Sequence, residues 1–286
     1  MRHPTAHRKE NPVDSHTRTS SSTRVGLLGL AALAAGSVLS AQAPATVRDL
    51  VSEVLHKRPA ANYFVIPVAG HVVGVNGNEF RTDVTISAAA PTRVAVAWMA
   101  QNADNSSRPL SFFDVGPRPA FLEDMVEISL HETGLGALVV AAVAPDGTVD
   151  TAARITGFAR IWTAASGCSG TSSLAVRSGR FGNGGSAYGF SAYGIRLDEG
   201  HRANLGIVNP NPVPIVVQGF VSSPQFAISV PPFSMRQVPI PAPADTSADG
   251  TIDVSFVSAS GGAFFAGYAV SVDQVSGDGW LVSLSE

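Results

Sequence analysis

The stretch HRANLGIVNPNPVPIVV, residues 201–217, carries the pattern that decides the fold. Ala203, Leu205 and Ile207 alternate with polar residues, as expected for a β-strand with one face toward a core. Two Asn-Pro pairs then occupy residues 209–212 and supply turn chemistry. The apolar run that follows resumes a strand. The stretch therefore predicts a strand, a turn and a return strand.

Residues 80–96, FRTDVTISAAAPTRVAV, repeat this pattern at an offset of 121 positions. The matched identities include Arg81 with Arg202, Ile86 with Ile207 and Pro91 with Pro212. Further along, the offset becomes 110, and Gly157 and Ala159 match Gly267 and Ala269. Self-similarity over this distance indicates two modules of about a hundred residues each.

Each module shows six or seven short strands at regular spacing, the pattern of an Ig-like sandwich. We therefore predict an all-β chain of two tandem Ig-like antiparallel β-sandwich domains. The predicted boundaries are module 1 at residues 62–175, a Gly/Ser-rich linker at 176–185 and module 2 at 186–286. We also expect residues 136–143 to pair through the turn at 145–147 with residues 153–163, and residues 250–258 to pair with 262–272.

One short amphipathic helix is predicted between residues 44 and 61, ahead of the first module. Val47, Leu50, Val51, Val54 and Leu55 follow the spacing of one helical face, and Thr46 is a suitable cap.

Residues 1–43 are expected to be a basic leader and secretory signal peptide. A polar, basic stretch ends at Arg24, and the fifteen apolar residues 25–39 precede the small residues SAQA. That apolar run is shorter than the roughly 20 residues needed to cross a bilayer, so no transmembrane span is expected after cleavage. The protein is then secreted or extracellular, with the periplasm or cell surface as alternatives.

Composition excludes one class of partner. Without residues 1–43, the chain has 14 basic and 20 acidic residues, a net charge of −6, and no basic stripe. Nucleic acid is therefore not expected as a partner. Cys168 is the single cysteine, so no internal disulfide is expected.

The motifs FRTDVTIS and HRANLGIVNPNPVPIVV, with the later GFARIW and GYAVSV segments, resemble those of a family of exported bacterial proteins. Its members consist of tandem β-sandwich modules with an Arg-x-Asp/Asn-aliphatic strand and an Asn-Pro turn. The resemblance covers most of residues 62–286. It implies the fold and export, and it implies no activity. The first module departs from the pattern, because SAAAP stands where the second has VNPNP.

The alternating polar residues of the two matched strands are the first candidate site. Arg81 and Asp83, and their counterparts Arg202 and Asn204, lie on the strand face opposite the predicted core. One interpretation is a polar ligand surface repeated on both modules. The other, which we favour, is cross-strand pairing on a solvent-exposed face.

The segment DTSADGTID is the candidate metal site. Asp245, Ser247, Asp249 and Asp253 follow the order of an EF-hand-type Ca²⁺ loop, with Gly250 at the turn. Phe256 stands where the bidentate Glu belongs, so a polar turn leading into a strand is the simpler interpretation. Calcium is the one cofactor that the sequence suggests.

No nucleophile motif or metalloprotease motif is present. We therefore expect a secreted, non-catalytic structural, adhesion or binding protein, with an extracellular protein or a glycan as partner. The alternative is an exported hydrolase whose site is built from loops around residues 101–133, including Ser111, Asp114 and His131. A weaker alternative is a Ca²⁺-dependent binding module.

Overall fold

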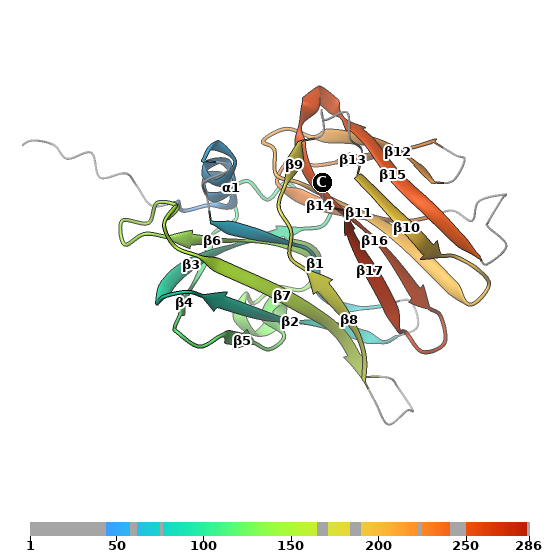
Figure 1. Cartoon of the computed structure of the whole chain (residues 1–286), viewed down its shortest axis with the longest axis horizontal. Helices are drawn as coiled ribbons and strands as arrows, with labels where there is room; N and C mark the ends of the chain where they lie inside the picture. Colours follow the sequence, from blue (N-terminus) through green and yellow to red (C-terminus); the bar gives the residue numbers. More distant parts are fainter. Residues whose placement is uncertain are drawn as a thin grey trace, which may run out of the picture. The chain divides into compact units, whose positions relative to one another are not determined.

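Runs of small and β-branched apolar residues, broken by Gly, Pro and Asn, make this chain mostly β. The computed structural model describes residues 44–57, 62–74, 77–164, 171–183, 190–221, 225–240 and 250–284. These residues form three antiparallel sheets and one short α-helix (Figure 1). All of them belong to one compact unit. The predicted leader and signal peptide, residues 1–43, and Cys168 lie outside the described residues.

The first eight strands form one antiparallel sheet in the order β4-β3-β6-β1-β2-β7-β8, with β5 paired to β2. Their bounds are β1 Tyr63–Val73, β2 Glu79–Ala88, β3 Thr92–Ala100, β4 Ser111–Val115, β5 Ala120–Leu122, β6 Gly134–Val143, β7 Ile155–Ala164 and β8 Thr171–Arg177. β1 and β2 pair only at Val72–Phe80 and Val73–Glu79. The sheet bends at this junction, so that β1 also lies against β7.

The remaining strands form two sheets, in the orders β10-β15-β12-β13 and β14-β11-β16-β17, with β9 paired to β16. Their bounds are β9 Gly182–Asn183, β10 Phe190–Arg196, β11 His201–Asn209, β12 Ile215–Val221, β13 Gln225–Val230, β14 Ser234–Pro239, β15 Thr251–Ala259, β16 Phe264–Asp273 and β17 Gly279–Leu284. A π-helical turn, η1 (Met125–Ser129), follows β5, and a 3-10 turn, η2 (Ser260–Gly262), follows β15.

The strand pairings of β1–β8 and β10–β17 correspond one to one. β2 pairs with β5 and β7 as β11 pairs with β14 and β16, and β6 pairs with β1 and β3 as β15 pairs with β10 and β12. The register corresponds too. Ile86 faces Gly157 and Ile207 faces Gly267, which are the residues matched at offsets of 121 and 110. One difference is that β1 and β2 pair at their ends and thereby join the first eight strands into one sheet.

The predicted pairing of residues 136–143 with 153–163 is wrong, and so is that of 250–258 with 262–272. β6 pairs with β1 and β3, whereas β7 pairs with β2 and β8. β15 and β16 do not pair either, and they lie in different sheets. The turn after β6 does form: Gly147 has a φ of 84°, and Ala144 N donates to Thr148 O at 2.8 Å. Residues 149–154 then lead to β7, which β1 and β2 separate from β6 in the strand order, a path that strand periodicity does not encode.

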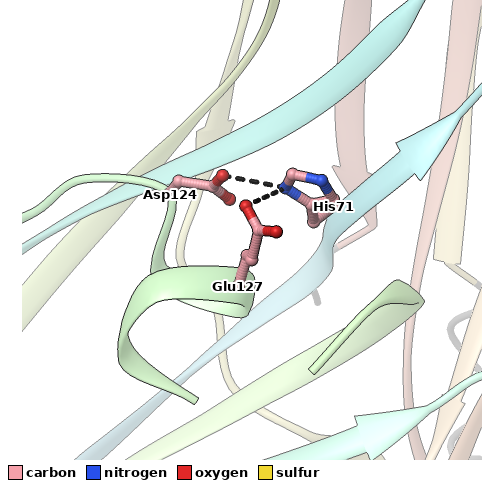
Figure 2. A group of neighbouring side chains, drawn as sticks. All are labelled: His71, Asp124 and Glu127. Carbon is pink, nitrogen blue, oxygen red and sulfur yellow. Dashed lines mark hydrogen bonds and ion pairs between the residues drawn. The ribbon is translucent and has the colours of Figure 1, made fainter. Parts of the chain in front are cut away.

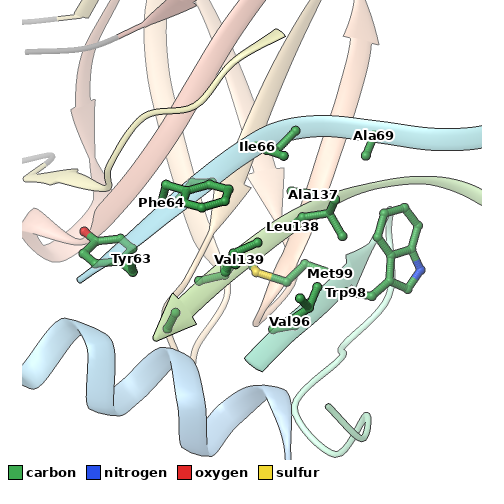
Figure 3. Close-up of a cluster of buried hydrophobic side chains, with 14 of the residues drawn as sticks. Tyr63, Phe64, Ile66, Ala69, Val96, Trp98, Met99, Ala137, Leu138 and Val139 are labelled. Carbon is green, nitrogen blue, oxygen red and sulfur yellow. The ribbon is translucent and has the colours of Figure 1, made fainter. Parts of the chain in front are cut away.

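The predicted helix is confirmed as α1, Val47–His56. Thr46 and Asp49 form a capping box, in which each side chain bonds the backbone N–H of the other. The apolar face contacts β3 and β6, and four of its side chains are completely buried. They are Val47, Leu50, Val51 and Val54. Figure 3 shows the helix beside the buried side chains of β1, β3 and β6.

The sheet β14-β11-β16-β17 is apolar on both faces. Leu205, Ile207 and Ala269 point into a core shared with β10, β12, β13 and β15. Val208, Tyr268 and Val270 belong instead to the core of the first eight strands. In Figure 1, β11, β16 and β17 accordingly lie between β1 and β10.

Residues 178–183, which lie in the predicted linker, contact both the first sheet and the sheet that contains β16. β8 continues to Arg177, and Gly179 then exchanges two backbone hydrogen bonds with Val65 of β1. The side chain of Phe181 is buried in the first core. Gly182 and Asn183 form β9, which pairs with β16. The backbone therefore passes from one sheet to the other without leaving the packed structure.

The strand–turn–strand prediction for residues 201–217 agrees with the structure. β11 ends at Asn209 and β12 begins at Ile215, in the facing sheet. The side chain of Asn209 is completely buried. Its amide nitrogen lies within hydrogen-bond distance of the carbonyls of Val213, Val230 and Pro231, at 2.9, 3.2 and 2.7 Å. One buried amide thus holds the corner where the chain changes sheets.

Replacing Asn209 with Ala should destabilise the protein by about 2–4 kcal/mol, because the two N–H donors that serve the carbonyls of this corner are lost. The measurement is urea unfolding followed by tryptophan fluorescence. Thr92→Ala is the matched control in the corresponding turn of the first half. Thr92 makes one exposed hydrogen bond there, to Ala90 O at 2.7 Å, so its loss should cost less than about 1 kcal/mol. Equal effects in the two variants would contradict this role for Asn209.

Candidate functional site

A cluster of charged side chains gathers where β1, β2, β7 and η1 meet. Side chains alternate along a strand, so His71 of β1 shares a face with Val73, whose cross-strand partner is Glu79 of β2. Asp124 and Glu127 approach this face from the turn that begins η1. In a chain with only 14% charged residues, this concentration of charge sets the region apart.

His71 is the centre of the cluster, and its side chain is only 12% exposed. Nδ1 lies 2.8 Å from Asp124 Oδ2 and 3.3 Å from Glu127 Oε2, and Nε2 lies 2.8 Å from Glu79 Oε1 (Figure 2). Both ring nitrogens therefore face carboxylates. A neutral imidazole carries one N–H, so it can donate to only one side of this arrangement.

Asp124 is held in an unusual conformation. Its φ of 38° and ψ of 57° place it in the left-handed region, which few residues other than glycine adopt. Its backbone N–H donates to Asp83 Oδ1 at 3.1 Å, and its carbonyl accepts the N–H of Ile128 at 2.9 Å. The side chain is 2% exposed, and Oδ1 has no hydrogen-bond partner among the described residues. The fold thus buries a carboxylate with one oxygen unsatisfied.

Arg81 and Asp83, both predicted as site residues, belong to this cluster. Arg81 donates to Glu79 Oε2 at 2.8 Å and stacks over the Trp162 ring at 5.5 Å. The Arg81 guanidinium is the main cause that holds the pKa of Glu79 below its usual value. Asp83 accepts two hydrogen bonds from Arg160, its cross-strand partner, at 2.7 and 3.2 Å. The pairing matches the cross-strand alternative, although the Asp83 side chain is buried rather than solvent-exposed.

Burial tends to raise the pKa of Asp83, yet the net pKa lies below the usual value. The causes that lower it are the nearby Trp162 indole, the Asp124 N–H and the Arg160 guanidinium. Asp83 is therefore charged in the folded protein under neutral conditions, and it anchors the loop that carries Asp124.

A cavity of about 510 Å³ lies beside this cluster, between the first sheet and the sheet β14-β11-β16-β17. Its walls are mostly apolar and include Val72, Phe80, Trp162, Tyr268 and Val270. Arg202, Asn204, Gln101 and Gln237 supply the polar groups of its lining. The amide oxygen of Gln101 is buried and has no hydrogen-bond partner among the described residues.

The two predicted pairs of site residues therefore have different surroundings. Arg81 and Asp83 belong to the charged cluster, whereas Arg202 and Asn204 line the cavity. Arg202 forms no ion pair within the described part of the chain. The face of β11 that carries it is turned toward the first sheet and its core.

The predicted calcium ligands Asp245, Ser247 and Asp249 lie outside the described residues. Asp253 is exposed on β15, and its Oδ1 accepts the Gly194 N–H at 3.1 Å.

The residues named for a hydrolase site are divided between β4 and the segment after η1. Ser111 and Asp114 lie on β4, paired with Val96 and Arg93 of β3. His131 follows η1 with a φ of 56°. Among the described residues, no hydrogen bond or ion pair joins His131 to either of them. Elsewhere in the 101–110 loop, Asn105 donates to Phe233 O at 2.9 Å, a contact with the second half of the chain.

A second histidine has carboxylates at both ring nitrogens. His201 Nδ1 lies 2.8 Å from Asp198 Oδ1, and Nε2 lies 3.6 Å from Asp273 Oδ2. The hydrogen bond with His201, followed by that from Arg196, lowers the pKa of Asp198 strongly. Among the described residues, no group of three ligand atoms lies close together around His201, whereas one does around His71.

Comparison with known proteins gives no relative: no protein-family model, curated protein or solved structure matches this chain. No helix among the described residues is long and apolar enough to cross a membrane.

No motif in the sequence marks His71, Glu79, Asp124 or Glu127 as site residues. One signal was available, because Glu79, Arg81 and Asp83 alternate along a strand in a chain with few charges. Nothing local connects His71 with residues 124–127, since no motif spans the distance between them.

Asp83→Asn should lower stability at pH 7 by about 1–3 kcal/mol, because a buried charge-assisted pair is lost. The pKa of Asp83 is depressed in the folded state, so its charge stabilises the fold above its ordinary pKa near 3.8. That contribution is lost as the pH falls through the lower folded-state value. The difference between variant and wild type should therefore shrink toward pH 2, as measured by urea unfolding across pH.

Asp253→Asn is the control for this prediction. It removes an exposed carboxylate with one backbone contact, and it should change stability by less than about 0.5 kcal/mol at any pH. An Asp83→Asn deficit that stays constant from pH 7 to pH 2 would contradict the role assigned to the Asp83 charge.

Proposed function

We propose that this chain is an exported, non-catalytic binding protein that holds a small amphiphilic molecule in the cavity between its sheets. The observation that carries the proposal is the cavity itself: about 510 Å³, apolar walls and a few polar groups. Pockets of about 300–1,000 Å³ with this kind of lining hold most small ligands of proteins.

The lining defines the class of ligand. Phe80, Trp162 and Tyr268 offer aromatic surface to an aliphatic or aromatic body. The Arg202 guanidinium, which has no ion-pair partner among the described residues, is available to a carboxylate, sulfate or phosphate head group. The Gln101 oxygen, unsatisfied within the described part of the chain, accepts from a hydroxyl or amide N–H. A molecule with one anionic end and an apolar body fits all three features.

We further propose that the fold consists of two β-sandwich modules of one Ig-like type, related by internal repetition. The support is the one-to-one correspondence of strand pairings and the agreement of their register with the sequence offsets. The resemblance to exported tandem-sandwich proteins also supports two sandwich modules. In residues 1–43 a basic segment, an apolar segment and small residues follow one another as in a secretory signal peptide, which supports secretion.

The hydrolase alternative has less support. Among the described residues, nothing links Ser111, Asp114 and His131 into a nucleophile and base. The loop that would build such a site instead contacts the second half of the chain: Asn102 N donates to Met235 O at 3.0 Å, and Ala103 N donates to Ser234 Oγ at 3.3 Å.

The test is fluorescence titration of the purified protein with dansyl-labelled undecanoate, which has an apolar chain and a carboxylate. We expect saturable binding with blue-shifted emission. Val270→Phe, which fills the cavity, should weaken binding at least tenfold. Arg202→Gln should weaken binding of this probe about tenfold and leave binding of the corresponding neutral alcohol unchanged, because only the charged head group is affected.

Arg236→Gln is the matched control. Arg236 lies on β14 near the cavity wall, but its guanidinium bonds Ser229 O at 3.0 Å instead of lining the cavity. Its substitution should leave both affinities unchanged. The proposal fails if the probe does not bind, or if Val270→Phe leaves binding intact.

A further inference from the structure

The charged cluster around His71 presents three ligand atoms of the kind that divalent metal ions take. The candidate atoms on His71, Asp124 and Glu127 all lie within 4.8 Å of one another. Figure 2 shows the three side chains pointing toward one another from β1 and the η1 turn. The set combines one imidazole nitrogen with two carboxylates, which suits a first-row transition metal better than Ca²⁺, because Ca²⁺ takes six to eight oxygens.

Distances support a small ion. Ligand atoms around a tetrahedral Zn²⁺, each about 2.0–2.1 Å from it, lie roughly 3.3 Å apart. His71 Nδ1 and Glu127 Oε2 are 3.3 Å apart, and Nδ1 and Asp124 Oδ2 are 2.8 Å apart. An increase of about 0.5 Å in the distance between His71 Nδ1 and Asp124 Oδ2 is then sufficient to admit the ion.

An independent observation comes from the buried carboxylate. Asp124 is 2% exposed, and its Oδ1 has no partner among the described residues. His71 engages only Oδ2, and a buried carboxylate oxygen such as Oδ1 is normally hydrogen-bonded or bound to a metal, because leaving it unsatisfied is costly. The surrounding charges agree. Three carboxylates, those of Glu79, Asp124 and Glu127, surround the His71 ring, with Arg81 as the cation nearby, so a divalent cation is compatible with the charge of the cluster.

The hydrogen bond at the other nitrogen of His71 is also typical of a histidine that binds metal. A histidine that binds metal through one nitrogen usually donates its other N–H to a carboxylate. His71 Nε2 lies 2.8 Å from Glu79 Oε1, and Glu79 is in turn held by Arg81 at 2.8 Å. Glu127 is 53% exposed, so the site opens to solvent on that side. A fourth position is thereby accessible to water.

We propose that His71 Nδ1, Asp124 and Glu127 bind one Zn²⁺ ion, with Glu79 orienting the imidazole as a positioning residue. The ion replaces the proton between His71 and Asp124 and fastens η1 to the end of β1. The site does not use the proposed ligand of the cavity, because none of His71, Asp124 and Glu127 lines that cavity.

The experiment is calorimetric titration of the full-length protein with ZnCl₂ at pH 7, followed by thermal unfolding with and without Zn²⁺. Wild type should bind Zn²⁺ at this site and gain thermal stability, while Ca²⁺ should produce neither effect. Asp124→Asn and Glu127→Gln should each weaken binding at this site at least tenfold. Asn suits position 124 because it tolerates the left-handed conformation. Glu79→Gln should weaken binding by about 10–100-fold through the orientation of His71.

His201→Gln is the matched control, because His201 also lies between carboxylates but has no third ligand atom among the described residues. It should leave Zn²⁺ affinity unchanged. Imidazole ¹⁵N spectra provide a readout that separates this site from histidines elsewhere in the chain: Zn²⁺ should shift Nδ1 of His71 and leave His201 unmoved. Unchanged Zn²⁺ affinity in Asp124→Asn and Glu127→Gln, or an unmoved His71 signal, would overturn the proposal and leave an ion-pair cluster of structural role.

Discussion

Two-sided burial of the sheet β14-β11-β16-β17 is the constraint on which the rest of the structure depends. Leu205, Ile207 and Ala269 fill one core, and Val208, Tyr268 and Val270 fill the other. Completely burying a large apolar side chain contributes about 1.5–3 kcal/mol. Separating the halves would expose several such residues at once. The halves therefore stay together through this face, although the chain between them is rich in Gly and Ser.

Local features of the fold could be predicted from sequence because they depend on nearby residues. The capping box of α1 and the corner at Asn209 each rest on a few consecutive positions. The partner of each strand depends instead on distant segments, so β6 and β7 were assigned to one hairpin although they pair with other strands. The two-sided sheet did leave a signal. LGIV in β11 and FFAGYAV in β16 are continuous apolar runs, which are typical of strands buried on both faces.

The candidate site, too, could be predicted from sequence only where it depends on local pattern. Alternation along β2 and β11 identified Arg81, Asp83, Arg202 and Asn204, but it could not show what covers each face. The face of β2 with Arg81 and Asp83 meets η1, whereas the face of β11 with Arg202 and Asn204 lines the cavity. Equivalent strand positions therefore carry different chemistry. His71 joins Asp124 and Glu127 only through tertiary structure, which no local pattern in the sequence specifies.

The charged cluster and the cavity share one hairpin, formed by β1 and β2. The junction pairs are Val72–Phe80 and Val73–Glu79. Val72 and Phe80 line the cavity together with Val73 at the end of β1, whereas His71, Glu79 and Arg81 form the cluster. Trp162 belongs to both: its ring lines the cavity and stacks under Arg81. A shift of the hairpin that repositions the cluster must also move the cavity wall, so the geometry of either site constrains the other.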